Sequence, residues 1–277
     1  MTISVLMSTY YKENPQYLQE SLNSLWTEQI RKPDQIVLVE DGPLTNELDA
    51  VVDHWQHQLN NKLVVVKNPE NRGLAESLNA GLAVVTGDLI ARMDSDDRCV
   101  PERFLLQERY MAEHPEVDIL GGSIQEFNDN GSLHNVRSYP LSMADVLKTM
   151  YRVAPLAHPS VMFRKTFFDA GFRYNAKYHI CEDVTMWYDA AVAHRVINNL
   201  PDTILYFRRN DSMMNRRSRE KAWSEFLAYN DGIYRLYGLF TYKYIFSLLR
   251  MCFRLMPATA IKSVYNSRFR KIVARQR

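Results

Sequence analysis

Cysteine is scarce in this chain of 277 residues, and the three that occur, Cys99, Cys181 and Cys252, stand far apart. No CxxC pair is present, so the spacing predicts neither a disulfide framework nor a structural zinc site. The amino terminus lacks the basic and long apolar segments of a signal peptide. No stretch of about 18 apolar residues free of charge occurs either. We therefore expect a protein of a reducing cytosol, without an export signal or a conventional membrane-spanning helix.

Acidic residues are absent from the last part of the sequence. From Gly232 to Arg277 there are 10 Lys or Arg and no Asp or Glu, which leaves 24 basic and 32 acidic residues in the first 231. Such asymmetry predicts an anionic partner for the tail. An acidic body without a recognised nucleic-acid-binding motif argues against nucleic acid and favours membrane lipid.

Apolar runs and helical patterns alternate through the first half of the chain. Four strands are expected, in the segments ISVLMST, QIVLVEDG, KLVVVKN and DLIARMD. Continuous apolar strands that alternate with amphipathic helices are typical of a mainly parallel sheet covered on both faces. The sequence therefore predicts an α/β fold of the Rossmann-like kind.

The second half is less regular. The segment VDILGGSIQEFNDNGSLHNV predicts strands joined by an Asn-Gly turn at Asn130 and Gly131, and PSVMFRK predicts another short strand. A helix is expected to begin near Glu182, and from about Arg216 the pattern is helical again.

Polar side chains follow each of the first four strands. Ligands of such sheets bind at the carboxyl ends of the strands, so these groups are expected to meet at one edge. They are Thr9, Tyr10 and Glu13; Glu40 and Asp41; Asn71, Arg72 and Gly73; and the aspartates of DSDD.

The aspartates Asp94, Asp96 and Asp97 repel one another unless a cation neutralises them. Oxygen ligands without a nearby Cys or His favour Mg²⁺ or Mn²⁺ over zinc. The D-x-D arrangement predicts that Asp94 and Asp96 hold a metal and a nucleotide together. The alternative is that the cluster caps the following helix or forms a solvated turn.

Four segments in this order, SVLMSTYYKE, IVLVEDG, NRGLAESLNAG and ARMDSDD, resemble family 2 glycosyltransferases. The resemblance covers roughly residues 1 to 210, and LAHPSVMFRK resembles a segment of the family's bacterial O-antigen and capsule enzymes. It implies a GT-A fold, an inverting mechanism, a nucleotide-diphospho-sugar donor and a Mn²⁺ or Mg²⁺ cofactor. By this resemblance the metal lies on Asp96 with Asp94, and eight residues bind the donor: Thr9, Tyr10, Glu13, Asp41, Arg72, Asn79, Asp94 and Ser95.

Several of these residues have plainer explanations. Asp41 suits a uracil N3–H as an acceptor, but an Asp-Gly pair also forms turns. A lone arginine such as Arg72 is more often a surface residue, and Asn79 is equally a packing position.

The segment CEDVTMW resembles the family's "ED" motif and implies that Asp183, beside Glu182, is the general base. The helix amino terminus stabilises carboxylates there, although acids in a first turn are also common as caps. Weaker matches suggest that His158, Arg208 or Arg209 contacts the acceptor or the diphosphate. The alternatives are a structural histidine and ion pairs within the acidic body. Asn210 stands where relatives often carry a histidine, so the resemblance does not assign a third metal ligand.

The tail between Ile233 and Met256 is rich in Tyr, Phe and Leu. A narrow polar stripe of Lys243, Ser247, Arg250 and Arg254 interrupts a broad apolar face, a pattern typical of a basic amphipathic helix in a membrane interface. A terminal helix packed on the core is the alternative.

Together these observations predict a glycosyltransferase domain at 1–215, with a donor-binding half at 1–115 and an acceptor-binding half at 116–215, and a membrane-associating region at 216–277. The expected reaction transfers a hexose or N-acetylhexosamine from a UDP-sugar to a lipid-diphosphate-linked saccharide. A β-linkage would form in O-antigen or capsule synthesis, with the enzyme peripheral at the cytoplasmic face of the inner membrane. The alternatives are a nucleotidyltransferase and a catalytically silent scaffold.

Overall fold

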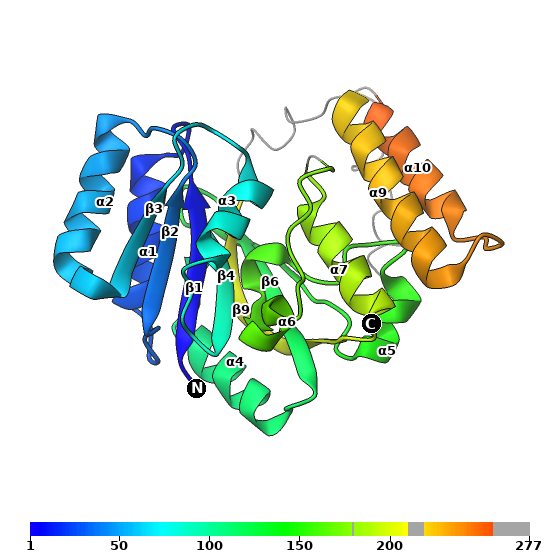
Figure 1. Cartoon of the computed structure of the whole chain (residues 1–277), viewed down its shortest axis with the longest axis horizontal. Helices are drawn as coiled ribbons and strands as arrows, with labels where there is room; N and C mark the ends of the chain where they lie inside the picture. Colours follow the sequence, from blue (N-terminus) through cyan, green and yellow to red (C-terminus); the bar gives the residue numbers. More distant parts are fainter. Residues whose placement is uncertain (179, 210–218, 257–277) are drawn as a thin grey trace.

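The computed structural model describes residues 1–178, 180–209 and 219–256. One sheet of nine strands runs through the molecule in the order β3-β2-β1-β4-β8-β6-β9-β5, and β7 pairs with β6 (Figure 1). The strands are β1 Ile3–Thr9, β2 Gln35–Glu40, β3 Leu63–Lys67, β4 Leu89–Asp94, β5 Arg98–Cys99, β6 Val117–Phe127, β7 Leu133–Arg137, β8 Met162–Arg164 and β9 Val196–Arg208.

The first four strands are parallel, as their apolar sequences predict. β8 is antiparallel to both β4 and β6, so the sheet is mixed. The chain order reverses between β1 and β4, because β2 and β3 lie on one side of β1 and β4 on the other. Such a switch point leaves a crevice at the carboxyl ends of the strands.

Helices cover both faces of the sheet (Figure 1). Alternate residues of the strands face opposite layers, so Ile3, Val5 and Met7 pack with one set of helices and Leu6 with the other. One layer contains α1 Pro15–Trp26, α2 Asn46–Leu59 and α4 Arg103–Glu113. The other contains α3 Leu74–Leu82, α5 Met143–Thr149, α6 Lys165–Asp169 and α7 Glu182–Val192.

Two further helices, α9 Arg219–Tyr237 and α10 Tyr244–Leu255, form a hairpin at one end of the molecule (orange in Figure 1). The turn between them begins at Gly238, whose φ of +81° suits glycine. α9 packs on α7 at Gly232, where an added Cβ would lie 2.3 Å from the ring of Tyr188. The hairpin is therefore joined directly to the helix that carries Glu182 and Asp183.

The polar stripe of α10 faces the rest of the protein, whereas the predicted interface helix requires this stripe to face water. Ser247 is fully buried, Arg250 lies 3.3 Å from Glu225 of α9, and Arg254 pairs with the same carboxylate. The ammonium of Lys243 lies 4.7 Å from the centres of three tyrosine rings. The two arginines are partly buried and pair with a buried carboxylate of the protein, so the stripe packs inward and the apolar side of α10 faces outward.

Candidate active site

A cavity of about 500 Å³ opens at the carboxyl ends of β1, β2 and β4. Eighteen residues line it, and they include most of the side chains that the sequence predicts for the site. Those brought together are Thr9, Tyr10, Glu13, Asp41, Asp94, Ser95, Asp96, His158, Glu182, Asp183 and Arg208. Arg72, Asn79 and Arg209 do not line this cavity.

The hydroxyl of Thr9, at the end of β1, is buried and has no partner among the described residues. Nearby, the hydroxyl of Ser95 donates a short hydrogen bond to the carboxylate of Glu13. This contact joins the loop after β1 to the loop after β4. The cavity wall is thus built from the two strands that flank the switch point.

Asp41 follows β2, and its carboxylate organises the neighbouring loop. The backbone N–H groups of Arg72 and Gly73 donate to it at 2.7 and 3.0 Å. Because these bonds leave lone pairs free, the carboxylate still offers acceptors to the cavity that it lines. The Arg72 side chain is half exposed and lies 3.9 Å from Glu76. Asn79 bonds to the backbone of Tyr174.

The carboxylate oxygens of Asp94, Asp96 and Asp97 lie within 4.8 Å of one another. Burial, Asp96 and Asp94 raise the pKa of Asp97 well above its usual range. One oxygen of Asp97 accepts from the backbone N–H of Arg208, while the other is buried without a partner among the described residues. A cluster of carboxylate oxygens of this kind fits Mg²⁺ or Mn²⁺.

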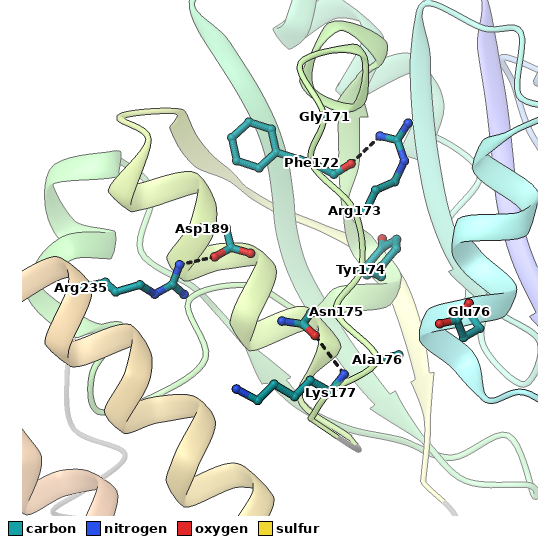
Figure 2. Close-up of a pocket in the computed structure, with 10 residues that line it drawn as sticks. All are labelled: Glu76, Gly171, Phe172, Arg173, Tyr174, Asn175, Ala176, Lys177, Asp189 and Arg235. Carbon is teal, nitrogen blue, oxygen red and sulfur yellow. Dashed lines mark hydrogen bonds and ion pairs between the residues drawn. The ribbon is translucent and has the colours of Figure 1, made fainter.

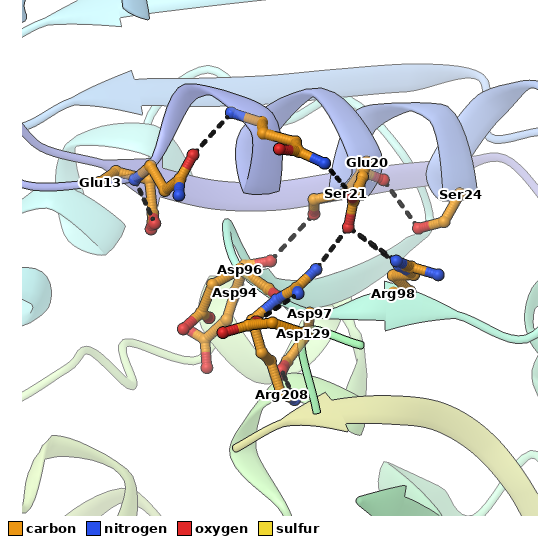
Figure 3. A network of polar contacts seen from close by, with 12 residues as sticks. Glu13, Glu20, Ser21, Ser24, Asp94, Asp96, Asp97, Arg98, Asp129 and Arg208 are labelled. Carbon is orange, nitrogen blue, oxygen red and sulfur yellow. Dashed lines mark hydrogen bonds and ion pairs between the residues drawn. The ribbon is translucent and has the colours of Figure 1, made fainter. Parts of the chain in front are cut away.

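Arg208, at the end of β9, holds this acidic loop from beneath (Figure 3). Its guanidinium donates to the carbonyl of Asp96 at 2.7 Å, to Asp129 at 2.9 Å and to Glu20. It also lies 3.9 Å from the centre of the Tyr17 ring. Arg208 therefore forms ion pairs within the body of the protein, which is the alternative that the sequence left open. Arg209 is half exposed and pairs with Glu126.

Glu182 and Asp183 begin α7 on the opposite wall of the cavity. Burial and the neighbouring Glu182 raise the pKa of Asp183 to about 7. The backbone N–H of Val184 donates to its carboxylate at 2.7 Å. A carboxylate with a pKa near neutrality is suited to accept a proton, because a general base is most effective when its pKa lies near the pH at which it operates.

His158 lines the cavity from the segment between α5 and β8. Its Nε2 lies 3.1 Å from the hydroxyl of Tyr174. Burial and Arg92 lower the pKa of His158 well below its usual range, so the imidazole is neutral. A neutral ring offers one donor and one acceptor but no charge.

Five lining residues were not predicted from the sequence, and they are Ser8, Leu74, Arg92, Ile180 and Phe207. Arg92 lies in β4 and Ile180 directly precedes the CEDVTMW segment with a φ of +74°. The signal for Arg92 was present, because a single arginine interrupts an otherwise apolar strand. Nothing in the sequence marked Ile180.

A second and more open hollow of about 690 Å³ lies between α3, α7, α9 and the segment around Tyr174 (Figure 2). Arg235 of α9 donates to Asp189 of α7 at 2.6 Å beside it. This hollow lacks the clustered aspartates of the first cavity.

A search of the described helices for a membrane span found no candidate of sufficient length and hydropathy.

Comparisons with known proteins agree with this geometry. Residues 4–172 match the model of "Glycosyl transferase family 2". The chain is 35% identical to the amylovoran biosynthesis glycosyltransferase AmsE of Erwinia amylovora, over 95% of this chain and 97% of that protein. It is 30% identical to a UDP-Gal:alpha-D-GlcNAc-diphosphoundecaprenol beta-1,3-galactosyltransferase of Escherichia coli, over 98% and 97%.

A solved structure also resembles the chain. The mannosyltransferase PcManGT of Pyrobaculum calidifontis, in complex with GDP-Man and Mn²⁺, superposes with a TM-score of 0.64 at 16% identity and covers 95% of this chain and 78% of that one. At this identity the likeness shows the fold, which is the mixed α/β sheet of GT-A enzymes.

Proposed function

We propose the following activity for this chain, which belongs to glycosyltransferase family 2. It transfers a hexose or N-acetylhexosamine from a nucleotide-diphospho-sugar, preferably a UDP-sugar, to a hydroxyl of a lipid-diphosphate-linked saccharide. The observation that carries the proposal is one cavity with clustered aspartates on one wall and the Glu182–Asp183 pair on the other. The named relatives support bacterial surface polysaccharide as the product.

The donor is proposed to lie along β1, β2 and β4. Thr9, Tyr10, Glu13 and Ser95 would line the nucleotide, and Asp41 would accept from its base. Arg72 and Asn79 would act through the loop and backbone contacts described above. A Mn²⁺ or Mg²⁺ held by Asp96 and Asp94 would neutralise charge on the departing diphosphate.

Asp183 is proposed as the general base. It takes the proton of the acceptor hydroxyl while that oxygen forms a bond to the anomeric carbon, and the bond from this carbon to the diphosphate oxygen breaks. Attack from the side opposite the leaving group inverts the anomeric carbon, so an α-linked donor gives a β-linkage. The neutral ring of His158 would hydrogen-bond a sugar hydroxyl.

The tail is proposed to attach the enzyme to the cytoplasmic face of the inner membrane. The turn and outer face of the α9–α10 hairpin expose apolar side chains, among them Phe240, which is 97% exposed. Six Lys or Arg without an acid follow in residues 257–277, which lie outside the described residues. Apolar insertion and cations near anionic headgroups together would hold it there. The proposed boundary between 215 and 216 also falls outside the described residues.

The test is direct. Purified protein is incubated with Mn²⁺, a panel of nucleotide-sugars and a short-chain GlcNAc-diphospho-lipid, and products are identified by mass spectrometry. A glycosylated lipid formed from one donor is expected. Turnover of none of the donors would contradict the proposal and favour the silent scaffold. Pyrophosphate released from an added nucleoside triphosphate and sugar 1-phosphate would indicate a nucleotidyltransferase.

A further inference from the structure

A buried arginine lies between the two acidic walls of the cavity. Arg92 belongs to β4, where alternation places it on the same face as Ile90, toward the layer that contains α7. Its side chain is 2% exposed yet lines the cavity. It stands two residues before Asp94, so the strand that presents the aspartates also presents this cation.

The hydrogen bonds of Arg92 are incomplete. Nη2 pairs with a carboxylate oxygen of Asp94, but Nε and Nη1 are buried and have no partner among the described residues. Unpaired buried donors reduce stability. An arginine that only stabilised the fold would have partners for these donors. The unpaired Nε and Nη1 therefore point to a role in the site.

The groups around Arg92 come from several elements. Asp94 lies on its own strand, Glu182 and Asp183 begin α7, and Tyr174 and His158 come from the segments packed between them. Tyr174 and His158 are neutral, since burial raises the pKa of the first and lowers that of the second. The charges that face Arg92 are therefore carboxylates from both walls.

The cavity offers these carboxylates little other compensation. Arg208 is the second arginine or lysine among the described lining residues, and its guanidinium is already engaged by Glu20, Asp129 and the carbonyl of Asp96. Arg92 is thus the lining cation placed to act on Glu182 and Asp183. Like charges brought together in a buried site destabilise each other unless a cation lies near.

We propose that Arg92 is a positioning residue that couples the two walls: its guanidinium fixes Asp94 on the donor side and offsets the repulsion between Glu182 and Asp183 on the acceptor side. The assignment of sides rests on the proposed function. The physical coupling does not, because it concerns contacts within the protein. Arg92 touches no reacting atom in this scheme and acts through the carboxylates that do.

A double-mutant cycle tests the coupling without any substrate. Thermal unfolding is measured for R92M, D183N and R92M/D183N. If Arg92 offsets charge at Asp183, the loss of melting temperature caused by R92M is smaller in the D183N background. Equal losses in both backgrounds would overturn the proposal. If R92M does not fold, R92K and R92Q give the same comparison, with a smaller loss expected for R92K because it keeps the charge.

Chemical rescue tests the role in transfer. With a donor that the wild type turns over, R92A should lower kcat by about a hundredfold while the KM for the donor changes less. Guanidinium at millimolar concentration should restore part of kcat, whereas urea, which has the same shape without the charge, should not. Rescue by both, or a kcat equal to that of the wild type in folded R92A, would overturn the proposal.

Arg164 provides the control, because it is a partly buried arginine outside the cavity that donates to the carbonyls of Met111, His114 and Val117 and pairs with no carboxylate in the described residues. R164A should lose melting temperature, keep kcat and show no response to guanidinium. If the wild type turns over no donor, the proposed function fails, and the unfolding cycle still decides the coupling.

Discussion

Asn79 holds the backbone of Tyr174 from both sides, with its Nδ2 donating to the Tyr174 carbonyl at 2.8 Å and its Oδ1 accepting from the Tyr174 N–H at 3.0 Å. These residues belong to α3 and to the segment before α7, which are 95 positions apart in the chain. Tyr174 in turn contacts His158 through its hydroxyl. A side chain expected to bind nucleotide therefore supports the cavity wall instead of lining it.

Replacement of Asn79 should accordingly affect stability more than nucleotide affinity. N79A leaves two backbone groups of Tyr174 without partners, which should lower the free energy of unfolding by about 1–3 kcal/mol. UDP affinity in the presence of Mn²⁺, measured by calorimetry, should stay close to that of the wild type. A large loss of UDP affinity at unchanged stability would show that Asn79 contacts the nucleotide after all.

The two acidic walls should be separable by mutation. D183N should reduce transfer by about 10²–10⁴-fold because no base takes the acceptor proton, while UDP still binds. D96N should abolish the Mn²⁺ dependence of UDP binding, and chelation of the metal should do the same in the wild type. Calorimetry with and without Mn²⁺ separates the two results. D169N removes an exposed carboxylate that pairs with Lys165 and should change neither measurement.

Transfer should increase with pH through neutrality. The pKa of Asp183 is raised to about 7 by burial and by Glu182, and the base must be deprotonated to act, so kcat should rise as pH increases through about 7. E182Q removes a negative neighbour and should move this rise to lower pH. Profiles of kcat from pH 5 to 9 measure the shift. A rise that stays at the same pH in E182Q would argue against coupling between the two carboxylates.

Arg208 and Arg209 are adjacent in sequence, but replacing Arg208 should lower the free energy of unfolding far more than replacing Arg209. R208M leaves Glu20 and Asp129 without their buried partner, and breaking such a network costs about 3–5 kcal/mol. R209Q alters a half-exposed pair with Glu126 and should cost within about 1 kcal/mol. Urea unfolding of both variants gives the comparison. Similar costs would mean that Arg208 does not hold the acidic loop.

Membrane binding should depend on the apolar side of the hairpin. Phe240 and Leu249 are 97% and 57% exposed, so F240S/L249S should fold normally but bind vesicles of phosphatidylcholine and phosphatidylglycerol about tenfold more weakly per side chain. Sedimentation at low and high salt measures it, because salt weakens only the part due to the cations. L133S, on exposed β7, should bind normally. Unchanged binding by F240S/L249S would place the contact elsewhere.

The sequence by itself determined the first four strands, the helices between them and the edge at which the polar residues meet. Local patterns suffice there, because strand alternation and helix periodicity depend on near neighbours, and parallel strands present the same ends. The Asn-Gly turn at Asn130 and Gly131 and the start of α7 at Glu182 were equally readable. The clustering of Asp94 and Asp96 followed from their spacing alone.

Tertiary structure decided which polar side chains face the ligand cavity and which stabilise the surrounding fold. Arg208 donates to the carbonyl of Asp96, which lies 112 residues earlier in the chain. Arg250 and Arg254 turn inward because both pair with Glu225 of α9. A helical pattern separates two faces but does not say which one packs. That choice, like the burial of Arg92, depends on partners that only folding brings near.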